Sequence, residues 1–391
     1  MVDVHKYGRR LEWAIGRVSK ALISETNRKA LFNFHSYCLA DGISPGKLYR
    51  YLDDILMLNR WVNKDFKRFT RKDMEQVMIK LDQTNYAEWT KYSFKTSLRR
   101  FFRWLGGKDE LPEHVRWIKL RMKNCNHKLP EELITEEEVK KMILAAGKPR
   151  DRALISSLYE SGCRISEILT IRMKNVNFDR YGSVITVSGK TGSRRVRLVF
   201  SVNYLQDWIN KHPFHDNPEA FVWNKGMSEE ILTYGRARDL LADLGKKAGV
   251  KKRVNPHNFR HSRASFLANH LTESQLKEVF GWTQASRMAS VYVHLSGKNT
   301  DSAILKVYGK VIDEEVKGGV LVPLECPRCK TENETTNKFC KLCGIPLDEK
   351  SQRELISKES QQIEANKLMN VLLKDKDIVN VLMEKLKEIK V

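Results

Sequence analysis

The chain has 391 residues, of which 41% are hydrophobic and 30% are charged, an ordinary globular composition with room for two or three domains. The longest run without Asp, Glu, Lys or Arg spans residues 30–40, too short for a membrane helix of about 20 residues. The first residues lack the apolar core of a secretory signal, so we expect a cytoplasmic protein.

Basic residues outnumber acidic ones, with 70 Lys and Arg against 48 Asp and Glu and a net charge of +22. The excess belongs to the body of the chain, because residues 326–391 hold 13 basic against 11 acidic residues. A folded body with this excess is typical of nucleic-acid-binding proteins. Binding to an anionic membrane, or simple basic solubility, is the alternative interpretation of the charge alone.

Residues 1–107 predict a helical first domain. Residues 11–22 and 91–105 repeat apolar side chains at a spacing of three to four, which is typical of amphipathic helices. In the second of these helices, Lys and Arg residues alternate with aromatic residues. We interpret its basic face as a DNA-phosphate contact, with a merely solvated face as the alternative; its residues are Lys95, Arg99 and Arg103.

Residues 108–134 predict a linker, because they are charged, contain two prolines and show no long apolar periodicity. Thr135, followed three residues later by Glu138, is the signature of a capped helix start. A second body is therefore expected over residues 135–316.

The second body predicts helices around a small antiparallel sheet. Residues 149–172 carry apolar side chains at helical spacing, whereas residues 183–199 change to a period of two around the turn Gly189-Lys-Thr-Gly192, which predicts a β-hairpin. Helical spacing then returns in four further segments, namely residues 201–211, 234–248, 258–270 and 273–280.

Four short motifs stand out in the second body, and each alone has an ordinary structural explanation. They are Ser161-Gly-Cys-Arg164-Ile-Ser-Glu167, Gly189-Lys190-Thr-Gly192, Pro256-His257-Asn-Phe-Arg260, and Gly281-Trp282 with Tyr292 ten residues beyond the tryptophan. In this order and spacing they resemble the tyrosine recombinase (phage integrase) family. The residues of the last motif look most like those of archaeal integrases and recombinases. The resemblance covers residues 135–300 and implies a helical DNA-clamping domain before them.

The resemblance implies a catalytic set for phosphoryl transfer. Arg164 and Arg260 would hold the phosphate, because guanidiniums stay charged and bind oxygens bidentately. Tyr292 would be the nucleophile, His257 its base or proton relay, and Lys190 the general acid for the leaving oxygen. Two further residues are implied to assist, namely Trp282, which stands where many members have histidine, and Glu167, which would hold Arg164.

The implied reaction is transesterification of double-stranded DNA through a 3′-phosphotyrosyl intermediate, without ATP, catalytic metal or small-molecule substrate. Family members exchange strands as a tetramer on paired specific sites, and residues 300–316 are the candidate oligomerisation helix. Tyr308 is the rival nucleophile. Two alternative functions remain, a non-cleaving DNA-binding regulator on the same scaffold and a type IB topoisomerase-like relaxing enzyme.

Four cysteines form two Cys-x-x-Cys pairs, which predict a structural zinc ribbon within residues 317–347; the alternative is redox or idle pairs. Residues 348–391 predict a helix with a short apolar stripe, either a coiled coil or one docked helix. The expected fold is thus mainly α with a small antiparallel sheet, comprising a core-binding domain, a catalytic domain of the DNA breaking-rejoining fold, the ribbon and the helix. The predicted zinc ligands are Cys326, Cys329, Cys340 and Cys343.

Overall fold

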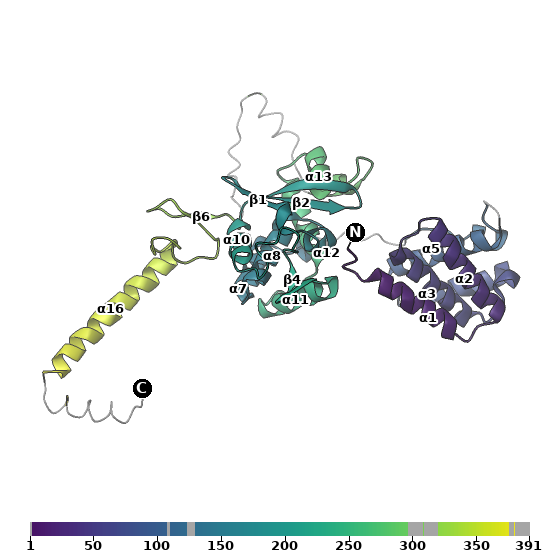
Figure 1. Cartoon of the computed structure of the whole chain (residues 1–391), viewed down its shortest axis with the longest axis horizontal. Coiled ribbons are helices and arrows are strands. Elements are labelled where there is room, and N and C mark those ends of the chain that lie inside the picture. Colours follow the sequence, from purple (N-terminus) through teal and green to yellow (C-terminus); the bar gives the residue numbers. More distant parts are fainter. Residues whose placement is uncertain are drawn as a thin grey trace. The chain divides into compact units, whose positions relative to one another are not determined.

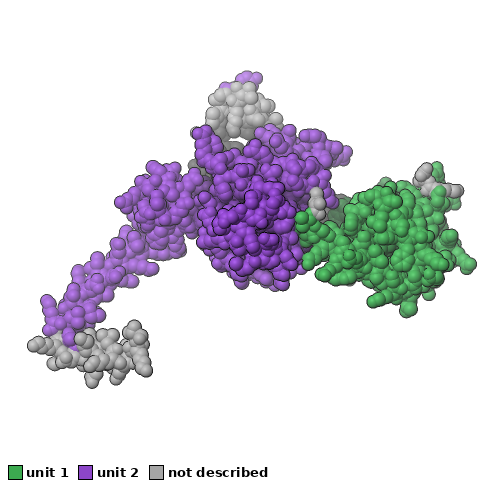
Figure 2. Space-filling view, viewed as in Figure 1, with its two compact units in different colours: residues 1–130 green, residues 131–391 purple. Residues whose placement is uncertain are grey.

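A computed structural model describes residues 2–107, 110–122, 130–295 and 320–374, together with Tyr308 and Val379. The chain divides into two compact units, residues 1–130 and 131–391 (Figure 2). The predicted mainly helical fold with small antiparallel sheets is confirmed (Figure 1). Among the described residues, every helix is too short or too polar to cross a bilayer.

The first unit is a bundle of helices around an aromatic core. Phe101 receives the edges of Phe34 and Phe66, at centroid separations of 5.1 and 5.0 Å, a preferred geometry for aromatic pairs. The two helices predicted from periodicity are confirmed as α1 and α5. The helices are α1 (Tyr7–Lys20), α2 (Glu25–Ala40), α3 (Pro45–Trp61), η1 (Phe66–Arg68), α4 (Arg71–Gln83), α5 (Glu88–Leu105) and α6 (Glu113–Arg116).

Part of the segment predicted as a linker belongs to this first core. Leu111, Val115 and Ile118 are buried in the same apolar cluster as the helices. The Arg99 guanidinium donates to the Ile118 carbonyl at 3.0 Å, so one of the predicted phosphate contacts also holds this segment in place. The linker prediction relied on charged residues and prolines, and it overlooked the short apolar pattern that anchors residues 111–118.

The second unit packs helices around the three-stranded antiparallel sheet β1-β2-β3. The predicted hairpin is confirmed, with Gly189 paired to Gly192 across the turn. The predicted capped start is also confirmed, because Thr135 and Glu138 form a reciprocal capping box. The elements are η2 (Pro130–Glu132), α7 (Glu136–Ala145), α8 (Pro149–Ser161), α9 (Ile165–Leu169), η3 (Met173–Asn175), β1 (Val176–Asp179), β2 (Gly182–Gly189), β3 (Gly192–Leu198), α10 (Val202–Asn210), β4 (Asn224–Lys225), β5 (Ser228–Ile231), α11 (Tyr234–Lys247), α12 (Pro256–Ala268), α13 (Glu273–Phe280) and α14 (Met288–Leu295).

The apolar repeat of residues 149–172 forms two helices, because Gly162 ends α8. Gly162 has φ of 56°, in the left-handed region that terminates helices. A Cβ there would lie 2.5 Å from the Phe280 ring, so this close approach also requires glycine. The interruption makes Arg164 the N-cap of α9.

A buried carboxylate ties the sheet to α8. Glu160 accepts hydrogen bonds from the backbone N–H groups of Val199, Phe200 and Ser201 at 2.7, 3.0 and 2.9 Å. It also accepts from the Ser201 hydroxyl at 2.6 Å. Because these groups follow β3 directly, Glu160 fixes the hairpin's base against the helix that leads to Arg164.

The C-terminal part contains the hairpin β6 (Leu324–Glu325) and β7 (Glu332–Asn333), followed by α16 (Glu349–Leu372). The hairpin region contacts α10, where the Tyr204 and Thr336 hydroxyls are 2.7 Å apart and Lys341 donates to Asn203 at 3.1 Å. The predicted C-terminal helix is present over the range of α16. The rest of its apolar stripe, apart from Val379, lies outside the described residues. The predicted oligomerisation helix, residues 300–316, lies outside them too, apart from Tyr308.

Candidate active site

The two predicted phosphate-binding arginines come from the start of α9 and from α12. Arg260 is only 6% exposed, and it donates to the Gly162 carbonyl at 2.9 Å and to the Phe280 carbonyl at 2.7 Å. Its guanidinium also lies 5.1 Å from the Phe280 ring and 5.4 Å from the Trp282 ring. These contacts hold a planar cation in a fixed orientation and leave other N–H groups for a ligand.

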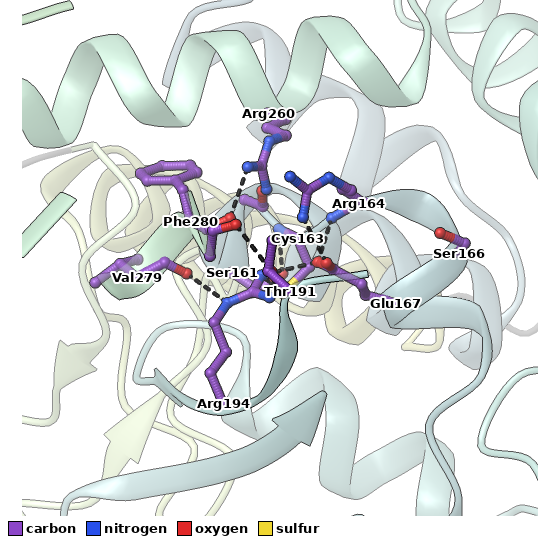
Figure 3. A network of polar contacts seen from close by, with 12 residues as sticks. Ser161, Cys163, Arg164, Ser166, Glu167, Thr191, Arg194, Arg260, Val279 and Phe280 are labelled. Carbon is purple, nitrogen blue, oxygen red and sulfur yellow. Dashed lines mark hydrogen bonds and ion pairs between the residues drawn. The ribbon is translucent and has the colours of Figure 1, made fainter. Parts of the chain in front are cut away.

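Glu167 is the anion at the centre of this cluster (Figure 3). One of its oxygens accepts from Arg164 Nη1 at 2.8 Å, while the other accepts from the Arg164 backbone N–H at 2.9 Å. The second oxygen also accepts from Arg194 Nη2 at 2.8 Å. The predicted partnership of Glu167 with Arg164 is therefore present in the structure, together with a second arginine from β3.

The electrostatics of the cluster favour a further anion. Burial opposes ionisation of Glu167, but its bonds to Arg194 and Arg164 outweigh burial and lower its pKa to about 2. Burial, followed by repulsion from Arg164, lowers the pKa of Arg260 to about 10. Two guanidiniums bond the one carboxylate, and Arg164 and Arg194 repel the third guanidinium, that of Arg260, so an incoming phosphate would relieve this repulsion.

Glu167→Gln should lower the free energy of unfolding by about 3 kcal/mol at pH 7, because it removes the charge that compensates the buried guanidinium of Arg194 and the partly exposed one of Arg164. The folded-state pKa of Glu167 lies below its ordinary value of 4.5, so its stabilisation is present above pH 4.5 and is lost as the pH falls toward about 2. Urea unfolding from about pH 7 to about pH 3 should show the gap between the two proteins closing with acid. A pH-independent gap would contradict this. The control is Glu219→Gln, which breaks an exposed pair with Lys174 and should change stability little.

Tyr292 lies on α14 beside this cluster. Its ring stacks on Trp282 with centroids 5.7 Å apart and planes at 3°, and Trp282 stacks in turn on Phe280. The hydroxyl is hydrogen-bonded to His261 Nδ1, and the His261 ring meets the His257 ring edge-on at 4.3 Å. Burial raises the pKa of Tyr292 to about 12, against the opposing effect of Arg260.

Lys190 occupies the two-residue turn between β2 and β3, where its side chain is exposed. The turn lies directly against the Glu167 carboxylate, because a Cβ on Gly189 would be 2.4 Å from one of its oxygens. On the other side, the Thr191 hydroxyl donates to the Gly281 carbonyl at 3.1 Å. The structure thus places Lys190 between the Arg164 motif and the Gly281-Trp282 motif.

Two residues of this site lie outside the predicted catalytic set. Arg194 shares one face of β3 with Val196 and Leu198, both buried, so a charge in an apolar period-two pattern was the available signal. The only sequence signal for His261 was its position directly after Arg260. That position does not predict a contact with Tyr292, which lies 31 positions further along the chain. The rival Tyr308 is 76% exposed.

The four clustered cysteines form a second candidate site. Their sulfurs all lie within 4.8 Å of one another. The Cys326–Cys343 and Cys329–Cys340 sulfur pairs are each 3.5 Å apart. Four thiolates at the corners of a tetrahedron around zinc would be about 3.8 Å apart, so this donor set could hold a metal ion.

The sequence matches known proteins over the region that contains the candidate active site. Residues 132–299 match the phage integrase family. The chain is 26% identical over 281 residues to the tyrosine recombinase XerA of Pyrococcus furiosus, covering 71% of this chain and 93% of that protein. It is 27% identical over 273 residues to a tyrosine recombinase of Thermosipho africanus, covering 68% of this chain and 94% of that protein.

Solved structures share the fold. The XerH site-specific recombinase in a post-cleavage complex with a palindromic difH substrate matches with a TM-score of 0.54 and 18% identity, over 77% of this chain and 95% of that one. A lambda integrase dimer bound to a COC′ core site matches with a TM-score of 0.56 and 14% identity, over 71% and 79%. Together with the order and spacing of the motifs, the sequence matches confirm the predicted resemblance. Residues 132–299 therefore form a phage integrase domain, and the chain as a whole resembles the tyrosine recombinases.

Proposed function

We propose that this site-specific recombinase breaks and rejoins DNA through Tyr292. The observation that carries the proposal is the contiguous stack Phe280–Trp282–Tyr292, in which the Tyr292 ring lies against Trp282 and the guanidinium of Arg260 lies over the Trp282 ring. A phenol next to clustered guanidiniums suits attack on a phosphodiester, whose non-bridging oxygens gain charge in the transition state.

The first step exchanges one phosphoester for another. The Tyr292 oxygen bonds to the scissile phosphorus, and the bond from phosphorus to the 5′-oxygen breaks. Arg164 and Arg260 neutralise the non-bridging oxygens, and Trp282 can add an indole N–H donor. The product is a 3′-phosphotyrosyl enzyme and a free 5′-hydroxyl, and a partner strand's hydroxyl reverses the step.

Two proton transfers accompany that exchange. Tyr292 loses its proton toward the histidine pair, in which His261 contacts the hydroxyl and His257 contacts His261. Lys190 gives a proton to the departing 5′-oxygen, a role suited to an exposed ammonium at a hairpin tip. Bond energy is kept in the covalent intermediate, so the step consumes no ATP.

The partner is double-stranded DNA with a specific site. Solved relatives of the same fold include XerH on difH in pre- and post-cleavage complexes and a lambda integrase tetramer on a Holliday junction. We extend this to a tetramer of the present chain on paired sites. The net charge of +22 supports binding to the DNA backbone.

A covalent-capture experiment tests the function and its nucleophile together. Nicked duplexes tiling the DNA around the encoding gene would be incubated with the protein in magnesium-free buffer. The duplexes are nicked because a nick beside the scissile phosphate lets the short 5′-hydroxyl strand escape. We expect a denaturant-resistant adduct whose peptide maps to Tyr292. Mapping to Tyr308 would overturn the nucleophile, specific binding without an adduct would favour the non-cleaving regulator, and relaxation of supercoils lacking a paired site would favour the topoisomerase-like enzyme.

We also infer that Cys326, Cys329, Cys340 and Cys343 bind one structural zinc ion, because four thiolates leave no open position for water. Cys340→Ser should release the zinc and unfold the ribbon. Loss of the contacts to Tyr204 and Asn203 should cost the catalytic body about 1 kcal/mol.

Elemental analysis and limited proteolysis measure the two effects of that change. Cys125→Ser, at a cysteine that is not one of the four predicted ligands, is the control and should keep zinc and protease resistance. Retention of zinc by the Cys340 variant would contradict the assignment. Collapse of the whole fold would show that the body depends on the ribbon.

A further inference from the structure

Arg194 joins three parts of the site that are far apart in sequence (Figure 3). It extends from β3, and its Nε donates to the Val279 carbonyl at the end of α13 at 2.8 Å. Its Nη2 donates to Glu167 at 2.8 Å and lies 3.5 Å from the Cys163 sulfur. The hairpin, the Arg164 helix and the helix before Trp282 are therefore linked through one side chain.

Two glycines lie in close contact with Arg194 and its partner Glu167. A Cβ on Gly281 would lie 2.7 Å from Arg194 Nη1, and a Cβ on Gly189 would lie 2.4 Å from a Glu167 oxygen. The Thr191 hydroxyl adds a second tie between the hairpin and the Gly281 carbonyl. Gly281 thus marks a close approach to the Arg194 guanidinium, and Gly189 marks one to the carboxylate that this guanidinium bonds.

We propose that Arg194 is a positioning residue that holds the hairpin tip, and with it Lys190, at the leaving oxygen of the scissile phosphate. The inference rests on the proposed role of Lys190 as general acid. The Arg194 side chain is only 10% exposed and its bonds run to protein groups, so it acts through Lys190 and does not touch DNA. Without Arg194, β3 loses its ties to both Glu167 and Val279.

A change of leaving group isolates this role. In a duplex whose scissile 5′-oxygen is replaced by sulfur, the departing thiolate has a pKa near that of a thiol, about 8.5, and needs no proton donor. Arg194→Met should slow single-turnover cleavage of the ordinary duplex about 100-fold, the typical loss for a displaced general acid. Cleavage of the sulfur duplex by the same variant should stay within about fivefold of wild type, which also shows that the variant is folded.

Two further variants complete the test. Arg195→Met, at the exposed neighbour on the opposite face of β3, is the matched control and should cleave both duplexes normally. Arg194→Lys keeps the charge but cannot bond both partners, so we expect the same selective defect in weaker form; it also serves if the Met variant does not fold. Equal losses on the two duplexes, or no loss, would overturn the proposal for Arg194.

Lys190→Ala separates this inference from its foundation. If the Lys190→Ala variant cleaves the sulfur duplex normally, the general-acid role of Lys190 stands. The comparison of the two duplexes with Arg194→Met then decides the Arg194 proposal. If sulfur fails to restore Lys190→Ala while wild type cleaves both duplexes, the assigned role of Lys190 is wrong, and the Arg194 proposal falls with it.

Discussion

Tyr292→Phe should abolish the covalent protein–DNA adduct while leaving DNA affinity within about twofold of wild type, since affinity comes mainly from backbone phosphate contacts. The substitution removes only the attacking oxygen. The new phenyl ring can still stack on Trp282, and the lost hydrogen bond to His261 should cost about 1 kcal/mol of folding stability. Adduct formation is measured on denaturing gels and affinity by fluorescence anisotropy on the same duplex.

The matched control for this experiment is Tyr308→Phe. Tyr308 is 76% exposed, so its hydroxyl can be removed without disturbing a core. We expect this variant to form adduct at the wild-type rate. If the Tyr292→Phe variant still forms adduct and the Tyr308→Phe variant does not, the nucleophile has been misassigned. A loss of DNA binding in the Tyr292→Phe variant would instead indicate a folding role.

The raised pKa of Tyr292 bears on how it could act as the proposed nucleophile. With a pKa of about 12, only about one molecule in 100,000 carries the phenolate at pH 7. We therefore expect the proton to leave as the bond to phosphorus forms. In the proposed mechanism, His261 would be the nearby proton acceptor, and the cluster around Arg260 would stabilise the negative charge that develops.

Elements with a strong internal period were predictable from the sequence. The hairpin of residues 183–199 and the helix start at Thr135 follow local rules of alternation and capping, which tertiary packing did not override here. Residues 149–172 differ, because the apolar repeat continues across Gly162 while the backbone does not. Gly162 itself was visible in the sequence. The position requires glycine because the Phe280 ring lies against it, and no local pattern could predict that contact.

The catalytic set was predictable as types and spacings, but its internal connections were not. The resemblance indicated that Arg164, Arg260 and Tyr292 belong together. It did not reveal that Arg194 completes the bonding of Glu167, because that contact joins residues 27 positions apart and depends on which face of β3 turns inward. Strand register and helix packing decide such contacts, and neither can be read from a motif.

Arg260→Lys should reduce the rate of DNA cleavage about 1000-fold, the upper end of the loss expected when one preorganised donor to a developing oxyanion is removed. A lysine cannot bond the Gly162 and Phe280 carbonyls and still present a planar donor pair to phosphate. Its compact ammonium also loses the stacking over Phe280 and Trp282. The measurement is single-turnover cleavage at saturating protein, where weaker binding cannot limit the rate.

The same substitution one turn along α12 separates chemistry from folding. Arg263 is also largely buried, donates to the Glu160 carbonyl at 2.9 Å and lies over the Tyr159 ring, but it has no place in the proposed mechanism. Arg263→Lys should lose a similar amount of stability in urea unfolding while keeping its cleavage rate. If the two variants lose activity in proportion to their stability, Arg260 holds the fold and another group must stabilise the phosphate. A large loss confined to Arg260→Lys would make its guanidinium a direct participant in the transition state.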